Sequence, residues 1–255
     1  EEEVSETIES NVFGSILHKV MEELYQPFCG KMVTADLLKA IRKDTPMLTG
    51  AIARAFAEIF FKTDIVRPLT GQNFLIGEMI RKYVEKVLER DAKQTPFRYI
   101  ESEKQIKCLF PLTDKSNIQL KGFIDRIDEV RDTVRIIDYK SGSGTTQFTS
   151  VEALFDKEDT DRSKAVMQVF MYAWMYGTVQ LSTAIQPGIY YMRTLFSPSF
   201  DPGIYRRTDR FKTEQVLDFA NYHADFENSL RNCLDEIFDT ETPFVQTPNG
   251  KACVY

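Results

Sequence analysis

Three charged residues that could act together occur near the middle of the chain. They are Asp125, Asp138 and Lys140, in the segment LKGFIDRIDEVRDTVRIIDYKSG. This segment predicts two β-strands joined by a tight turn, with Asp125 on the first strand and the other two residues on the second. Side chains alternate between the faces of a strand, so Asp138 and Lys140 should point the same way and Tyr139 the other. Two carboxylates and an amine at the ends of apolar strands are costly to bury. We therefore expect them to serve a divalent metal ion and a phosphodiester.

Hydrolysis of a phosphodiester requires that the phosphate charge be offset, that a water be made nucleophilic and that the leaving oxygen be stabilised. A carboxylate-held Mg²⁺ or Mn²⁺ contributes to all three, and Asp125 and Asp138 supply the one or two carboxylates that Mg²⁺ prefers. Lys140 could orient or deprotonate the attacking water and stabilise the charge of the transition state. His18 lies on a helix predicted from about Asn11 to Tyr25 and could add a nitrogen ligand, which Mn²⁺ tolerates better. A lone helical histidine is, however, more often a satisfied core or surface residue.

The composition describes a globular protein with a full core. Hydrophobic residues make up 43% of the 255 residues and charged residues 27%. No apolar run approaches the roughly 20 residues of a membrane span, and the acidic start EEEVSETIES is not a signal peptide. The four cysteines are too sparse for a disulfide scaffold, so we expect a reduced, cytoplasmic setting and no membrane partner. The net charge of −6 argues against a protein that coats nucleic acid but permits an enzyme with a local cationic channel.

The block of about residues 31–95 is expected to be helical, because residues 34–93 carry no strand signal. Thr34 can cap a short helix, ADLLKAIRK, and Asp44-Thr-Pro should break the helix there. A second helix is expected from about Gly50 to Lys62, and a long one around the apolar i, i+4 positions from Leu75 to Leu88. We expect this block to be a helical insertion beside the main sheet.

Strand signals begin near Phe97 and continue, after a turn over residues 111–117, into the segment that carries Asp125. In that strand Ile118, Leu120, Gly122 and Ile124 should share one face, and Gln119, Lys121, Phe123 and Asp125 the other. The third strand covers Val134 to Tyr139. The segment from Ser141 to about Asp161 is expected to be irregular.

The last third of the chain predicts a helix, a strand and a helix. The helix runs from about Arg162 to Tyr176, and Pro187 to Thr194 forms a strand buried on both faces. A final helix is expected over roughly Thr213 to Phe238, followed by an irregular tail. The order predicts a single α/β domain over residues 1–255, with a small mixed sheet flanked by helices. The absence of an initiator Met and the ending CVY suggest a C-terminal fragment of a longer protein.

Two further polar residues complete the pattern. Gln168 and Tyr172 are four residues apart on the predicted helix and should be neighbours on one face. Each part of the pattern has a simpler interpretation on its own: a strand end for DYKSG, an amphipathic edge strand for FIDRID and a polar helix face for Gln168 and Tyr172. Their joint order is much more specific.

Together these motifs resemble the PD-(D/E)XK nuclease superfamily, in particular its branch with the nuclease domains of RecB and AddB. The resemblance is carried by FGSILHKVMEELY around His18, LKGFIDRID, VRIIDYKSG and MQVFMYAWMYG around Gln168 and Tyr172. It implies a restriction-endonuclease-like core and a metal site made by His18, Asp125, Asp138 and the backbone carbonyl of Tyr139. It also implies that Lys140 is catalytic with the two aspartates, and that Gln168 and Tyr172 position DNA or the site.

The resemblance also raises two points that the motifs leave open. A Glu on the strand before the hairpin sometimes contributes to such sites, and Glu101 or Glu103 could fill that place. Many AddB-type relatives hold an iron–sulfur cluster with one upstream cysteine and three near the C-terminus. Here Cys253 could be the first of that group, but no Cys precedes His18, so the cluster is expected only in a longer parent chain.

The leading hypothesis is therefore a metal-dependent DNA nuclease, an exonuclease-type module that works with a helicase domain or subunit in DNA repair. A second hypothesis is a catalytically silent nuclease fold that binds DNA or a partner protein. A third places the same carboxylates in an unrelated acidic-cluster nuclease or phosphatase, a class that does not require the Asp-x-Lys pair.

Overall fold

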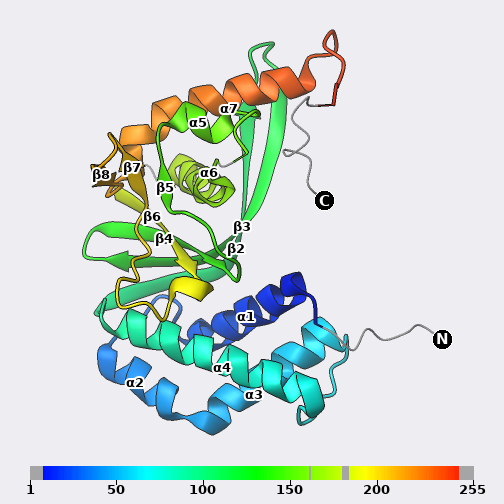
Figure 1. Ribbon diagram of the computed structural model, residues 1–255, viewed down its shortest axis with the longest axis vertical. Coiled ribbons are helices and arrows are strands. Elements are labelled where there is room, and N and C mark those ends of the chain that lie inside the picture. The colour runs from blue at the N-terminus through cyan, green and yellow to red at the C-terminus, as the bar shows by residue number, and fades with distance from the viewer. Residues whose placement is uncertain (1–7, 161, 180–183, 247–255) are drawn as a thin grey trace, which may run out of the picture.

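The computed structural model describes residues 8–160, 162–179 and 184–246, and it contains one central sheet with helices on both faces (Figure 1). The sheet has the strand order β1-β2-β3-β4-β6. Its strands are β1 (Met32–Val33), β2 (Phe97–Pro111), β3 (Asn117–Val130), β4 (Thr133–Lys140) and β6 (Ala184–Tyr191). Neighbouring strands from β1 to β4 are antiparallel, whereas β4 and β6 are parallel and are joined by a helical crossover. The predicted small mixed sheet is confirmed.

Two groups of helices cover the sheet. The first consists of α1 (Ser10–Tyr25), α2 (Ala35–Lys43), α3 (Thr45–Ala55) with the π-helical turn Phe56–Phe60, and α4 (Gly71–Ala92). The second consists of α5 (Val151–Phe155), α6 (Lys164–Val179) and α7 (His223–Phe238). Each group packs its own apolar cluster against the sheet, with α1 and α4 below and α6 and α7 above in the view of Figure 1. Within the described residues, none of the helices could cross a bilayer, because none combines the needed length with the needed hydrophobicity.

In the helical block between α1 and β2, capping residues determine where α2 and α3 begin. The Thr34 hydroxyl accepts a hydrogen bond from the Leu37 N–H and starts α2 as predicted. The expectation that the next helix starts near Gly50 is wrong. The Asp44 carboxylate caps the Met47 N–H and Pro46 lies in the first turn, where its missing N–H costs nothing, so α3 already begins at Thr45.

The strands β2 and β3, which form a hairpin, are much longer than β4, the next strand of the sheet. β4 pairs with β3 only up to the Arg126↔Ile137 register, whereas β2 and β3 stay paired as far as Pro111↔Asn117. Residues 104–111 and 117–124 therefore form a two-stranded arm that runs beside α6 (Figure 1). We call this hairpin the arm.

Several expectations for the C-terminal half are wrong. The segment expected to be irregular contains β5 (Gln147–Phe148) and α5. The single long helix expected from Thr213 is instead β8 (Thr213–Gln215), a 3₁₀ turn (Phe219–Tyr222) and α7.

A second sheet consists of β5, β7 (Tyr205–Arg207) and β8. Sequence periodicity does not indicate it, because each strand has only two or three residues. The strand expected up to Thr194 ends at Tyr191 and continues as a 3₁₀ turn. Cys253, considered above as the first of a C-terminal cysteine group, lies outside the described residues.

A buried network of charges joins the helical block to the sheet. Asp91 on α4 is fully buried and accepts hydrogen bonds from the hydroxyls of Tyr25 and Tyr190, at 2.5 and 2.7 Å, and from Arg126 Nη1 at 2.6 Å. Arg126 also donates from Nε to Asp128 at 2.7 Å. Buried charges are tolerated only when they are paired and hydrogen-bonded. The network therefore fixes α1, α4, β3 and β6 relative to one another.

We expect Asp91→Ala to lower the free energy of unfolding by about 3–5 kcal/mol. The substitution leaves Arg126 with one fewer carboxylate and removes the acceptor of two buried tyrosine hydroxyls. Denaturant titration measures the loss. The control is Glu89→Ala on the same helix, whose carboxylate pairs with partly exposed lysines and an arginine and should cost about 1 kcal/mol or less. Equal losses in the two variants would contradict the role of the network.

Candidate active site

Asp125 lies where β3 separates from β4. Its Oδ2 accepts a hydrogen bond of 2.7 Å from the N–H of Tyr139, which lies two residues beyond Ile137 in the last regular pair of the ladder. The side chain is 9% exposed. Burial raises the pKa of this carboxyl to about 7, the charge of His18 opposes the rise and that of Asp138 adds to it. The Asp125 carboxylate therefore accepts a hydrogen bond that a backbone carbonyl of β3 would accept if β3 and β4 were still paired at this point.

His18 reaches the same point from α1. Its Nε2 donates to the Tyr139 carbonyl at 2.9 Å, which leaves Nδ1 facing Glu103 and Asp125, each 3.6 Å away. Burial lowers the pKa of His18, but the hydrogen bond with Glu103 and the charges of Asp125 and Glu103 outweigh it and raise the pKa to about 9. The structure therefore brings together three groups expected at the metal site: His18, Asp125 and the Tyr139 carbonyl.

Glu103, rather than Glu101, belongs to the cluster. Glu101 forms an ion pair with Lys104 instead. Glu103 has φ 47°, a left-handed conformation that is uncommon for a residue other than glycine, and it follows a register shift between Tyr99 and Glu101. Such backbone strain is often found at functional sites. The shift decides which glutamate faces His18, and no property of the two side chains could have revealed it.

The cluster of His18, Glu103 and Asp125 fits a divalent ion. One ligand atom from each residue lies within 4.8 Å of the others, and the donors are an imidazole nitrogen and two carboxylates. Burial raises the pKa of Asp125, and a bound cation would instead favour the charged form of this carboxyl. An imidazole among oxygen donors favours Mn²⁺ more than Mg²⁺.

Asp138, expected as a further metal ligand, lies beside this cluster and pairs with Lys140. It is 1% exposed, and its Oδ1 and Oδ2 lie 3.0 and 2.8 Å from Lys140 Nζ. Burial raises the pKa of this carboxyl, whereas the charge and hydrogen bond of Lys140 oppose the rise. It lies outside the group of three that could hold an ion, although the charges of His18 and Glu103 act on it. The structure thus places Asp138 next to the cluster as the partner of Lys140.

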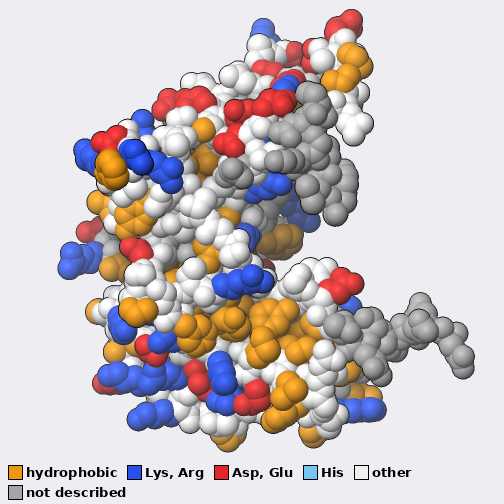
Figure 2. All heavy atoms as spheres, in the orientation of Figure 1, with side chains coloured by type: hydrophobic (Ala, Val, Ile, Leu, Met, Phe, Trp, Pro, Cys, Tyr) orange, Lys and Arg blue, Asp and Glu red, His pale blue; other side chains and the backbone are white. Residues whose placement is uncertain are grey.

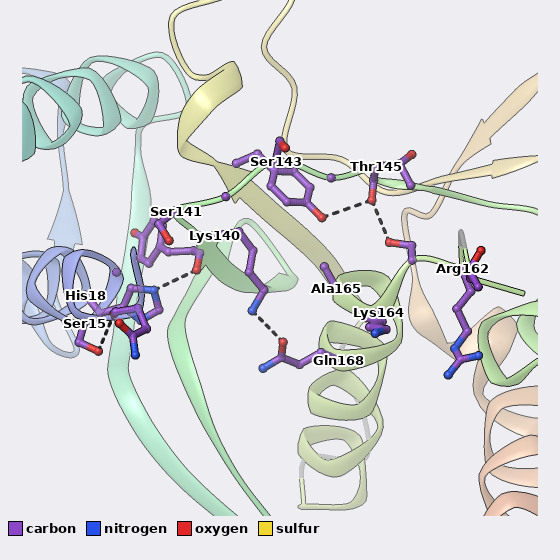
Figure 3. A pocket seen from close by; sticks show the side chains of 18 residues that line it. Ser15, His18, Lys140, Ser141, Ser143, Thr145, Arg162, Lys164, Ala165 and Gln168 are labelled. Atoms are coloured by element: carbon purple, nitrogen blue, oxygen red, sulfur yellow. Dashed lines mark hydrogen bonds between the residues drawn. The ribbon is translucent and has the colours of Figure 1, made fainter. Parts of the chain in front are cut away.

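Lys140, Gln168 and Tyr172 form a hydrogen-bonded chain across the cavity. Lys140 Nζ donates to Gln168 Oε1 at 2.7 Å, and Gln168 Nε2 donates to the Tyr172 hydroxyl at 2.8 Å. Figure 3 shows Lys140 pointing from the end of β4 to Gln168 on α6, with His18 on the opposite wall. The cavity has a volume of about 610 Å³ and is lined by α1, the loop of residues 141–145 and the start of α6. His18 and Lys140 both line this cavity, and its volume is in the range of small-molecule sites.

Gly122 supports this chain, a role that sequence reasoning missed. A Cβ atom at this position would lie 2.8 Å from Cε1 of the Tyr172 ring, so only glycine allows the ring to rest on the arm. The alternation that placed Gly122 on the face with Leu120 and Ile124 was correct, but it did not indicate what lies against that face.

The site geometry agrees with the comparison to known families. A model of the PD-(D/E)XK nuclease superfamily matches residues 1–255. The chain belongs to the PD-(D/E)XK nuclease superfamily. No curated protein sequence matched it. Members of the superfamily are generally nucleases that use divalent metals, and the mixed sheet between two layers of helices is consistent with their restriction-endonuclease-like fold. In this PD-(D/E)XK chain the Asp-x-Lys element is Asp138-Tyr139-Lys140.

The stability of the metal-free chain should fall as the pH rises from about 4 to 9. Asp125 holds its proton more tightly in the folded chain, so its contribution is complete below 3.8 and is lost as the pH passes about 7. The contribution of His18 is complete below 6.5 and is lost as the pH passes about 9. Urea denaturation in EDTA at several pH values measures the fall.

Asp125→Asn is the matched variant for this measurement. Its amide oxygen can still accept from the Tyr139 N–H, but the fall between pH 4 and 7 should shrink to the part that the raised pKa of Asp138 contributes. Saturating Mg²⁺ should also flatten the fall in the unsubstituted chain, because metal ligands bind deprotonated. The same pH dependence in both proteins would contradict the raised pKa of Asp125.

Gly122→Ala should destabilise the chain by about 1–3 kcal/mol, because the added methyl group displaces the Tyr172 ring. In a Tyr172→Ala background the same substitution should cost much less. Denaturant titration of the four proteins gives the coupling energy between the two positions. A coupling near zero would show that the ring does not rest on Gly122.

Proposed function

We propose that this chain is a divalent-metal-dependent nuclease that hydrolyses phosphodiester bonds of DNA. The observation that carries the proposal is the position of Lys140. Its ammonium is held by the Asp138 carboxylate and the Gln168 amide, beside the His18, Glu103 and Asp125 cluster. An ammonium group has three N–H donors, so one is left to donate to a water or a phosphate oxygen.

The residues divide the work of hydrolysis. When bound, the ion offsets phosphate charge and makes a water more acidic. His18, Glu103 and Asp125 would hold it, with Asp138 close enough to add to the negative charge. Lys140 would orient the attacking water and stabilise the extra charge of the pentacovalent transition state. Gln168 and Tyr172 would keep the lysine side chain extended toward the scissile phosphate.

The finer assignment follows the motif order of the RecB and AddB branch. We propose a single nuclease domain with exonuclease action, working with a helicase domain or subunit in cytoplasmic DNA repair. Its support is the occurrence of His18 on an early helix together with Gln168 and Tyr172 on the helix after the Asp-x-Lys strand. An iron–sulfur cluster involving Cys253 would need cysteines of a longer parent chain.

Cleavage of end-labelled single- and double-stranded oligonucleotides in Mg²⁺ or Mn²⁺ tests the proposal. Lys140→Ala should reduce the rate by about 10²–10⁴-fold while metal binding, measured by calorimetry, remains. Lys39→Ala, an exposed lysine on α2, is the control and should cleave normally. Products shortened from one labelled end would indicate exonuclease action. Absence of cleavage with retained DNA binding would instead favour a silent nuclease fold.

A further inference from the structure

The outer face of the arm is exposed along its whole length. Three cross-strand pairs make up this face: Gln105↔Phe123, Lys107↔Lys121 and Leu109↔Gln119. All six side chains are exposed, whereas the alternate residues of both strands turn toward α6 and its apolar cluster. This outer face therefore adds nothing to the core, and its composition is free to serve binding.

Two lysines face each other on this surface. Lys107 and Lys121 are direct cross-strand partners, and like charges placed in this way destabilise a hairpin. Neither lysine has an ion-pair partner among the residues that the structure describes, although the chain as a whole carries an excess of acidic residues. A pair of uncompensated cations on a hairpin is well suited to a polyanion.

An aromatic ring completes the surface. Phe123 is 44% exposed, and the ammonium of Lys121 lies 5.4 Å from the centre of its ring. An exposed aromatic ring beside a cation is the combination on which single-stranded nucleic acids bind, because every base has a face that can stack and every nucleotide a phosphate. A duplex hides these base faces, so the ring favours an unpaired strand.

The surface begins beside the metal-binding cluster. Phe123 precedes Asp125 by two residues and Gln105 follows Glu103 by two, which corresponds to roughly 7 Å along each strand. Lys121 is about 7 Å farther from the cluster by the same estimate. Figure 2 shows the molecule hollowed between its upper part and the α1–α4 layer, with basic and hydrophobic side chains gathered in the hollow.

We propose that the outer face of the arm binds a single strand of the substrate next to the scissile phosphate. A base stacks on Phe123, and the phosphates on either side are held by Lys107 and Lys121. The inference rests on the proposed nuclease function and adds a binding site outside the catalytic cavity. It implies that an unpaired strand of several nucleotides is bound more tightly than a short one.

Binding of a fluorescein-labelled 20-nucleotide single strand, measured by anisotropy in EDTA over a range of salt concentrations, tests this site without cleavage. Phe123→Ala should weaken binding about 5- to 150-fold and leave the salt dependence unchanged. Phe123→Trp should restore it. The double variant Lys107→Ala/Lys121→Ala should make the plot of log binding constant against log salt concentration less steep by about 1.4, since each phosphate contact contributes about 0.7. Phe211→Ala removes a more exposed ring beside Arg210, in the loop between β7 and β8; it is the control and should bind normally.

Cleavage assays separate this inference from the proposed function. With Mn²⁺, the Phe123 and lysine variants should raise the KM for the 20-nucleotide strand and leave the cleavage of a dinucleotide unchanged. Thermal unfolding should show that the double lysine variant is as stable as the unsubstituted chain or more so. Absence of cleavage by every protein would contradict the nuclease proposal alone. Unchanged binding in Phe123→Ala, or an equal loss in Phe211→Ala, would overturn the arm as the binding site.

Discussion

The hydrogen bond between the Asp125 carboxylate and the Tyr139 N–H is the constraint on which the candidate site depends. β3 and β4 must separate to open a cavity, and the separation leaves backbone groups without ladder partners. Asp125 satisfies the N–H and His18 satisfies the carbonyl of the same residue. These two hydrogen bonds also bring Asp125 and His18 together with Glu103. The candidate metal cluster therefore forms where the side chains replace the missing strand pairing.

The opposite side of Tyr139 is held just as firmly. Its hydroxyl accepts a hydrogen bond from Arg126, which Asp91 links to the helical block. The helices between α1 and β2 thus brace the strand that carries Asp138 and Lys140. Charges occur in three settings: a paired network in the interior, the cluster of His18, Glu103 and Asp125 at the cavity, and Lys107 and Lys121 on the arm, for which the described residues supply no ion-pair partner. An acidic protein can in this way still carry a local group of cations.

Sequence alone was sufficient for features that depend on local periodicity. The two-residue repeat of a strand placed Asp138 and Lys140 on one side, and their ion pair confirms it. The four-residue spacing on a helix placed Gln168 beside Tyr172, and their hydrogen bond confirms it. The long apolar helices and the hairpin strands followed from the same rules, because each pattern extends over several turns or residue pairs.

The tertiary structure decided everything that depends on where two strands part or shift. The register shift before Glu103 selected that residue over Glu101, and the short pairing of β4 turned Asp125 toward Tyr139. The strand β8 occupies the start of the segment predicted as the final helix, and it was missed because three residues are too few to leave a periodic signal. What the sequence determined was which residue types could perform the chemistry and which elements carry them. Their convergence on one cavity was decided by long-range strand pairing and packing, which no local pattern encodes.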